Sequence, residues 1–195
     1  MKYSISQKIV KTLAFGIVKF LYFITIEGKE NLPTKPYIIC ANHRSYLDPV
    51  FLVTTFNEPI YFMAKSDLFK IWWLAPILRW FNAFPVRRGE ADISAIKKSI
   101  SILKNNNILG IFPEGKRNKT KELLLPGEKG VASLVKLTNV KVVPIAICGK
   151  ILPFHKVKIK IAKPLEFSRN ELDEVIVNKI MTSIQESILK ELIKW

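Results

Sequence analysis

The sequence predicts one α/β domain with a mostly parallel central sheet flanked by helices, preceded by an amphipathic N-terminal helix. Short apolar runs of strand length alternate along the chain with longer segments of helical period. No repeat, low-complexity tract or Gly/Ser-rich linker interrupts this alternation. The chain has 195 residues, of which 49% are apolar, so it can bury one core and is too apolar to be disordered.

The N-terminal segment KIVKTLAFGIVKFLYFITI (8–26) has two faces at about 100° per residue. One face carries Lys8, Lys11, Thr12 and Lys19, the other carries Ile9, Val10, Leu13, Ile17, Phe20 and Leu21, and Phe15 lies among the lysines. The lysines interrupt the apolar run that a membrane span requires, and no cleavage site of a signal peptide follows. We therefore expect residues 1–26 to form a helix in a membrane interface and residues 27–195 to form the main domain. The alternative is that the helix covers the core of the protein itself.

The remaining elements follow from run length and period. Strands are expected at 37–42, 60–65, 83–86, 108–112, 141–148 and 156–162, where short apolar runs occur. Helices are expected at 49–56, which a proline opens, at 68–81, which Pro76 should kink, and at 92–105. Residues 122–130 are expected to form a loop. Ser168 and Glu171 have the spacing of a capping box, which predicts a final helix that reaches almost to Trp195.

The charge of the chain predicts an anionic partner. Against 31 Lys and Arg stand 16 Asp and Glu, which gives a formal net charge of +15. The basic residues are interleaved with Trp, Phe, Leu and Ile, which favours an anionic membrane surface over nucleic acid. Cys40 and Cys148 are isolated within strand-like runs, and no Cys/His cluster has the spacing of metal ligands. We therefore expect buried thiols and no metal.

The stretch CANHRSYLDPV (40–50) places His43 five residues before Asp48. If Pro49 opens a helix, Asp48 is its N-cap and residues 43–47 form a turn across which the two side chains can meet. The helix dipole favours a carboxylate at Asp48, which could fix the tautomer of His43 and stabilise its imidazolium. The pair is a candidate general base without a companion nucleophile, which points to direct attack by a substrate hydroxyl. The alternative is that Asp48 only caps the helix and His43 is an ordinary loop histidine.

A second stretch, GIFPEGKRNKT (110–120), places Gly115 and Arg117 directly after a predicted strand. A glycine lets backbone N–H groups approach a ligand, and an arginine offers a bidentate fork to a phosphate. Glu114 could orient Arg117 or bind a substrate hydroxyl. Taken alone, the stretch could be only a charged turn.

Together these stretches resemble the glycerolipid acyltransferase family, specifically the 1-acylglycerol-3-phosphate acyltransferases. NHRSYLD (42–48) is similar to the N-H-x4-D block, FPVRRG (84–89) to the second block, FPEGKRN (112–118) to the third and VVPIAI (142–147) to the fourth. The four blocks occur in family order over roughly residues 37–150. Arg88 occupies the arginine position of the second block. Lys116 and Asn118 replace a threonine and a serine of the third block, which bears on substrate preference rather than on chemistry.

This resemblance implies a reaction. His43 would deprotonate the free sn-2 hydroxyl of a lysophosphatidate, 1-acyl-sn-glycerol 3-phosphate, while Asp48 orients and charge-balances the imidazole. The hydroxyl would attack the acyl thioester of acyl-CoA or acyl carrier protein, and phosphatidate and a thiol would be released. The acceptor's glycerol phosphate would be held by four residues of the second and third blocks, with a lysine as a further phosphate ligand: Arg88, Glu114, Gly115, Arg117 and Lys65. The resemblance requires no metal or redox cofactor.

Because acceptor and product both reside in a bilayer, we expect peripheral, monotopic attachment to the cytoplasmic face of the cell membrane. The expected partners are an anionic membrane surface, lysophosphatidate and the acyl donor, with no nucleic acid. The aromatic segment 68–81, with Trp72, Trp73 and Trp80, could be core, wall an acyl channel or lie at the lipid headgroups. Two other functions stay open: acyl transfer to glycerol 3-phosphate or another lysophospholipid, and a non-enzymatic basic protein that binds membrane or nucleic acid.

Overall fold

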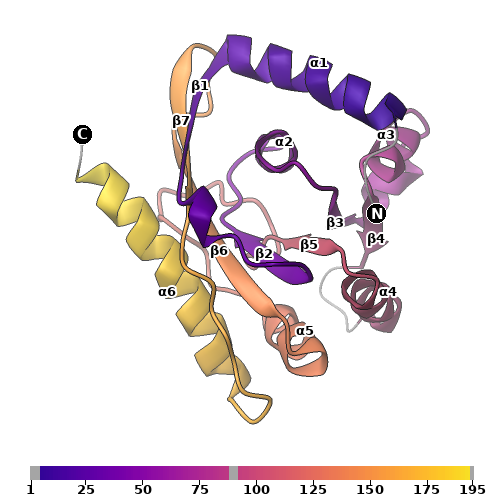
Figure 1. Ribbon diagram of the computed structural model, residues 1–195, viewed down its shortest axis with the longest axis vertical. Helices are drawn as coiled ribbons and strands as arrows, with labels where there is room; N and C mark the ends of the chain where they lie inside the picture. The colour runs from indigo at the N-terminus through magenta and orange to yellow at the C-terminus, as the bar shows by residue number, and fades with distance from the viewer. Residues whose placement is uncertain (1–4, 88–91, 194–195) are drawn as a thin grey trace.

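Seven strands form one central sheet in the order β1-β7-β6-β2-β5-β3-β4 (Figure 1). The computed structural model describes residues 5–87 and 92–193. Every strand pair is parallel except β6–β7, which is antiparallel. The predicted α/β class with a mainly parallel sheet is therefore confirmed. The strands are β1 (Tyr22–Glu27), β2 (Tyr37–Ala41), β3 (Ile60–Lys65), β4 (Ala83–Val86), β5 (Ile108–Ile111), β6 (Lys141–Gly149) and β7 (His155–Ile161).

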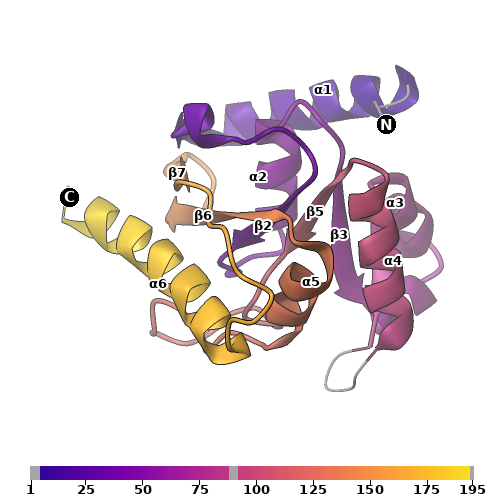
Figure 2. The same ribbon diagram turned by 60° about the horizontal axis from the view of Figure 1, so that its bottom comes forward.

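Helices cover both faces of the sheet, as Figure 2 shows. α1 and α2 lie over one face, and α4, α5 and α6 lie over the other. Because both faces are covered, the central strand β2 is buried along its whole length. The helices are α1 (Ile5–Leu21), α2 (Asp48–Thr55), α3 (Leu74–Trp80), α4 (Ile93–Lys104), α5 (Gly130–Thr138) and α6 (Asp173–Leu192), with short 3-10 helices η1 (Lys29–Asn31) and η2 (Ser66–Lys70).

The carboxyl ends of four parallel strands meet at one edge of the sheet. β2, β5, β3 and β4 are neighbours in the sheet and run in the same direction. The loops that follow them therefore gather at that edge, where α/β folds commonly bind their ligands. The first and third sequence blocks lie in these loops, so the topology brings together His43 and Glu114, which are 71 residues apart in the chain.

The N-terminal segment differs from the prediction at its end. The helix stops at Leu21, and residues 22–27 form β1, which pairs in parallel with β7 at the edge of the sheet. Val18 and Tyr22 are buried, and the Tyr22 ring packs edge-on against Phe51 of α2, with 5.2 Å between ring centroids. The apolar period of residues 22–26 does not distinguish a helix from a strand, and they were expected to continue the preceding helix. Pairing with β7, a long-range contact, decides their structure.

The aromatic segment 68–81 also differs from the prediction. It forms η2, a turn, and then the short helix α3, so Pro76 lies in the first turn of α3 and does not kink a longer helix. α5 was not predicted at all, because residues 130–138 are too few to show a clear helical period. Ser168 and Glu171 do bond to each other, but within a turn before α6, whose N-cap is Leu172.

Two lysines of β7, Lys158 and Lys160, are paired with carboxylates. Val157, Ile159 and Ile161 are buried, as the alternation predicts. Lys158 Nζ lies 2.9 Å from Oε1 of Glu191, a buried carboxylate near the end of α6, and also contacts Glu27 of β1. This strand face ties β1 and α6 to the sheet. Within the described residues, no helix combines the length and the apolar character that crossing a membrane requires.

Candidate active site

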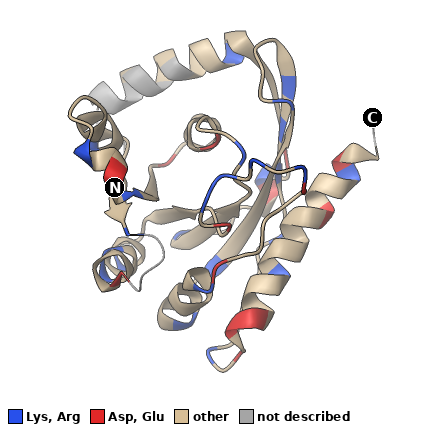
Figure 3. Ribbon diagram, turned by 180° about the vertical axis from the view of Figure 1, so that it is seen from behind, with Lys and Arg blue, Asp and Glu red and all other residues tan. Residues whose placement is uncertain are grey.

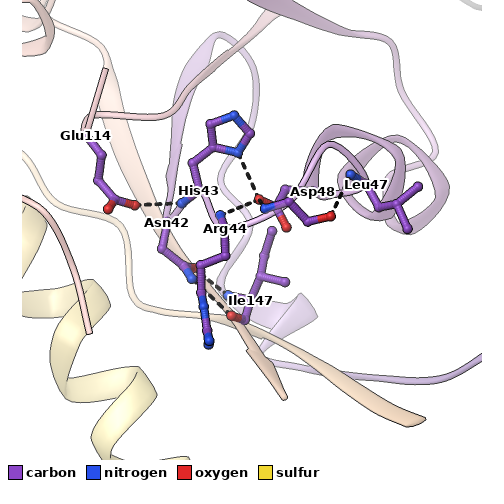
Figure 4. A network of polar contacts seen from close by, with 8 residues as sticks. Asn42, His43, Arg44, Leu47, Asp48, Glu114 and Ile147 are labelled. Atoms are coloured by element: carbon purple, nitrogen blue, oxygen red, sulfur yellow. Dashed lines mark hydrogen bonds and ion pairs between the residues drawn. The ribbon is translucent and has the colours of Figure 1, made fainter. Parts of the chain in front are cut away.

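His43 and Asp48 meet across the turn between β2 and α2 (Figure 4). His43 Nδ1 lies 2.8 Å from Asp48 Oδ2, and both residues are buried. Because the carboxylate can only accept, Nδ1 carries a proton and Nε2 is left as the basic nitrogen. The same Oδ2 atom accepts the backbone N–H groups of Arg44 and Ser45, each at 2.7 Å. The geometry is that of a histidine whose tautomer is set by a fixed carboxylate.

Asp48 does not act as the predicted N-cap. It is the first residue of α2, the N-cap is Leu47, and no side chain caps the helix. Pro49 follows as expected and offers no N–H to a capping oxygen. The carboxylate instead turns back toward residues 43–45, where three donors converge on it. The alternative in which Asp48 only caps a helix is therefore wrong.

An aromatic ring stacks on one face of the His43 imidazole. The Phe112 ring is stacked on His43, with centroids 4.1 Å apart and an angle of 21° between the planes. Phe62 of β3 continues the stack at 6.0 Å from Phe112. The sequence identified Phe112 as part of a motif but assigned it no role. Its signal was its position directly after β5, the neighbour of β2 in the sheet.

The loop after β5 is joined to the backbone of His43. The N–H of His43 donates to Glu114 Oε1 at 2.6 Å, and its carbonyl accepts the N–H of Asn118 at 2.7 Å. Glu114 Oε2 accepts the N–H of Leu125 at 2.8 Å, and the side chain is buried. Burial raises the pKa of Glu114, and the two N–H bonds partly offset this effect. Glu114 therefore joins the loop after β5 to the backbone of His43, and its contact with the acceptor stays a prediction.

Gly115 is required by the backbone rather than by an open N–H group. Its φ of +67° is in the left-handed region, and an added Cβ would lie 2.8 Å from Glu128 Cγ. Its own N–H donates to the Phe112 carbonyl and closes the turn. Its predicted contact with the acceptor stays a prediction.

Arg117 and Tyr46 bring the two loops together at the surface. The Arg117 guanidinium carbon lies 3.5 Å from the centroid of the Tyr46 ring, a close cation–π stack. Tyr46 is 68% exposed, so the stacked pair lies at the solvent boundary beside His43. Tyr46 was not singled out from the sequence, because its position within the N-H-x4-D block does not reveal its contact with Arg117. The stack holds the guanidinium plane in one orientation.

One further cation, Lys65, is among the residues that line the pocket beside His43. Lys65, the last residue of β3, is half-exposed and forms an ion pair with Asp67 at 2.6 Å, which Asp67 shares with Lys70. Arg88 lies outside the described residues. Its neighbour Arg87 donates its backbone N–H to Asp92 Oδ2 at 2.8 Å. Figure 3 shows Lys and Arg concentrated on the loop that follows β5 and on β7.

An apolar pocket of about 370 Å³ extends from this cationic edge into the molecule. His43, Lys65 and Arg117 lie among its lining residues, so one end is basic. The rest of the wall is largely apolar and comes from α2, β3 and the segment 68–81, including Val53, Phe62 and Phe81. An apolar pocket whose lining includes a histidine and two cations suits an amphiphile with an anionic headgroup.

The buried side chain of Asn42, next to His43 in the chain, joins two strands of the sheet. Asn42 bridges β2 to β6, since its Nδ2 donates to the Ile147 carbonyl at 3.0 Å and its Oδ1 accepts the Ile147 N–H at 2.7 Å.

Cys40 and Cys148 are buried and unpaired, and burial raises the pKa of Cys148 to about 11. Across residues 5–87 and 92–193, no three His, Cys, Asp or Glu side chains are grouped as metal ligands would be.

Comparison with known proteins places this site in a family. A family model described as Acyltransferase matches residues 23–148, from β1 to the end of β6, and so includes His43, Asp48 and the loop after β5. The chain belongs to the acyltransferase family. This assignment makes it an enzyme of acyl transfer and confirms the resemblance that the four sequence blocks carry.

Curated relatives are more specific. The chain is 32% identical over 149 residues to the 1-acyl-sn-glycerol-3-phosphate acyltransferase of Bacillus subtilis (strain 168), which covers 73% of each chain. It is 32% identical over 156 residues to the protein of that name from Saccharomyces cerevisiae, covering 75% of this chain and 50% of the relative. The crystal structure of the 1-acyl-sn-glycerophosphate (LPA) acyltransferase PlsC from Thermotoga maritima superposes with a TM-score of 0.78 at 24% identity. That match covers 96% of this chain and 80% of the other, and it supports the fold.

Proposed function

We propose that this acyltransferase transfers a fatty acyl group from an acyl thioester to the free sn-2 hydroxyl of 1-acyl-sn-glycerol 3-phosphate and so makes phosphatidate. The observation that carries the proposal is the His43–Asp48 pair at the basic end of an apolar pocket. The names of the curated relatives support the choice of acceptor.

The proposed reaction uses His43 as general base. Nε2 takes the proton of the acceptor hydroxyl as its oxygen attacks the thioester carbonyl carbon, and the new C–O bond gives a tetrahedral intermediate. The intermediate collapses with cleavage of the C–S bond, and the imidazolium returns the proton to the departing thiolate. Asp48 stabilises the imidazolium between these two steps, because its carboxylate is 2.8 Å from Nδ1.

The acceptor phosphate would lie against the cations at the pocket mouth. Arg117 offers a planar fork that Tyr46 holds in place, and Lys65 offers a second charge from the end of β3. Arg88 stays a predicted ligand on the strength of the second sequence block alone. Glu114 and Gly115 support the site through the backbone of His43 and the turn at residues 112–115, and their contact with the acceptor stays a prediction.

The co-substrate would be acyl-CoA or acyl carrier protein. Both donors are anionic, and the net charge of +15 suits either. The proposed chemistry needs a base, cations and an apolar pocket, all of which the chain supplies, and so it calls for no metal or redox cofactor.

Peripheral attachment to the cytoplasmic face of a membrane is part of the proposal. Val18 of α1 faces the core, whereas the large apolar residues on the other side of the helix are exposed: Ile5, Ile9, Leu13, Ile17 and Phe20. An apolar helix face left in water fits a helix that lies in a membrane interface. Lys19 is exposed, while the side chains of Lys8 and Lys11 are outside what the structure describes.

The helix can be tested without cutting the chain. Deletion to residue 26 would remove β1 and Tyr22 from the fold, so substitution of the exposed face is the sharper experiment. Replacing Leu13, Ile17 and Phe20 by serine should reduce binding to vesicles that contain phosphatidylglycerol, with unchanged circular dichroism. Undiminished vesicle flotation of this variant would contradict attachment through α1.

The acceptor is tested by a matrix of substrates. Purified protein is offered lysophosphatidate, glycerol 3-phosphate or lysophosphatidylcholine as acceptor. Each acceptor is combined with acyl-CoA or with acylated acyl carrier protein as donor, and the released free thiol is measured. We expect release of thiol that depends on lysophosphatidate. Equal or faster turnover of glycerol 3-phosphate would assign the other acceptor, and binding to vesicles without any turnover would favour a non-enzymatic role.

A further inference from the structure

A second group of exposed apolar side chains lies outside α1, in the segment between η2 and α3. Trp72 is 85% exposed and Trp73 is 54% exposed, and Ile71 and Ile77 beside them are also open to solvent. Large aromatic side chains seldom remain this exposed in water, since each could bury more apolar area than almost any other residue. Such a group indicates a surface that something else covers.

The elements on either side of the tryptophans, η2 and α3, contribute to the wall of the apolar pocket. Leu68, Ile77 and Leu78 line the pocket, and Ile77 is at the same time exposed on the outside. The exposed tryptophans are therefore flanked in the chain by residues that line the pocket, Leu68 before them and Ile77 after them. Neither tryptophan is itself among the residues that line the pocket.

The segment lies close to the apolar face of α1. Figures 1 and 2 agree that α3 lies beside the N-terminal end of α1, although the two helices are more than 50 residues apart in the sequence. α1 and the 71–77 segment thus both carry exposed apolar side chains and lie near each other in the fold.

Two cations flank the exposed tryptophans in the chain, one of them, Lys70, in an ion pair with exposed Asp67. Lys70 precedes them with a side chain that is largely exposed, and exposed Arg79 follows them, with its guanidinium carbon 5.7 Å from the centroid of the Phe69 ring. Tryptophan favours the boundary between lipid headgroups and acyl chains, and lysine and arginine are attracted to anionic headgroups. The combination matches the chemistry of an anionic bilayer surface.

We propose that Trp72 and Trp73 form a second membrane contact, separate from α1, which seats the edge of the acyl pocket at an anionic lipid surface. The contact rests on the proposed function only in that the substrate is a lipid. Two contacts would fix the orientation of the pocket relative to the bilayer, whereas α1 alone would allow rotation about its own axis. The acyl chain of a substrate then passes from the bilayer to the pocket beside Ile77.

Vesicle binding of a Trp72→Ala/Trp73→Ala variant tests the proposal. The vesicles contain phosphatidylcholine and phosphatidylglycerol in equal amounts, and no substrate is present, so the result does not depend on turnover. We expect affinity to fall about tenfold or more, because binding scales with the apolar area that enters the interface. The matched control is Leu137→Ala/Leu172→Ala, which removes two exposed apolar side chains on the helices of the other face and should bind as wild type does.

Activity separates this contact from the active site. With a short-chain, water-soluble lysophosphatidate the tryptophan variant should turn over as wild type, while its rate on vesicle-embedded acceptor should fall with its binding. If the wild type showed no acyl transfer, the proposed function would fail and the binding result would still decide this proposal. Wild-type affinity of the tryptophan variant would overturn it.

Fluorescence provides a second measurement that does not require the alanine variant to fold. Brominated lipids should quench the emission of wild-type protein on vesicles, and most of that quenching should disappear in Trp72→Phe/Trp73→Phe, which retains Trp80 and Trp195. Equal quenching of the two proteins would place these side chains outside the bilayer and refute the contact.

Discussion

Substitution of Asp48 by asparagine separates the electrostatic part of the His43–Asp48 pair from its geometry. The side chain keeps its shape, and the amide oxygen can still accept from His43 Nδ1 and from the N–H groups of Arg44 and Ser45. The amide nitrogen must then occupy the position of Oδ1. That atom is buried and has no hydrogen-bond partner, so the variant places an unsatisfied donor there.

Two magnitudes follow from this geometry. A carboxylate and an imidazolium whose charges are about 4 Å apart attract each other by about 4 kcal/mol at an effective dielectric constant of about 20. Loss of most of this attraction in the transition state should lower kcat by roughly 10²- to 10³-fold. The unsatisfied amide donor should also cost about 1–3 kcal/mol of folding free energy. The carboxylate thus matters for rate and, to a smaller degree, for stability.

The assay is steady-state release of free thiol, with urea unfolding followed by circular dichroism on the same samples. We expect kcat of Asp48→Asn to fall with little change in KM for lysophosphatidate, and kcat of His43→Ala to fall further. Asp173→Asn on α6 is the control for an aspartate-to-asparagine change in an ion pair remote from the site. Retention of more than about a third of the wild-type kcat by Asp48→Asn would refute the role of the carboxylate, since it corresponds to less than about 1 kcal/mol.

Four other predictions test the surrounding residues. Arg117→Ala should raise KM for the acceptor by roughly 10- to 150-fold, the equivalent of a charge-assisted hydrogen bond of about 1.5–3 kcal/mol, and KM for the donor should change little. Tyr46→Ala should raise the same KM by a smaller factor and Tyr46→Phe should not, because phenylalanine keeps the ring under the guanidinium; equal values for the two would exclude the stack. Gly115→Ala should lower both kcat and the melting temperature, because φ of this residue is +67° and Glu128 occupies the space that a Cβ would need. An unaltered melting temperature would contradict this requirement for glycine. Burial raises the pKa of Glu114, so the free energy of unfolding gains a contribution that is present below the unfolded pKa of about 4.3 and is lost as pH rises through the higher folded pKa. Urea unfolding at a series of pH values between these two pKa values should therefore show wild type losing stability relative to Glu114→Gln. A difference that stays constant with pH would contradict the raised pKa.

The motifs and most of the secondary structure were predictable from the sequence. A strand such as 37–42 is a short apolar run and the helix 92–105 has a clear period, so local pattern was enough for both. The N-H-x4-D spacing predicted that His43 and Asp48 meet across a turn, because a contact over five residues depends on local backbone alone. The family resemblance rested on the order of the four blocks.

Tertiary contacts decided the rest. Residues 22–27 became a strand because β7, more than 130 residues later, offered an edge to pair with. The sequence did not show that Glu114 accepts the backbone N–H groups of His43 and Leu125, which both require an acceptor in a buried place. The role of Tyr46 depends on a stack with Arg117, which is 71 residues away in the chain. Such pairings depend on which strands lie side by side, and a one-dimensional pattern does not contain that information.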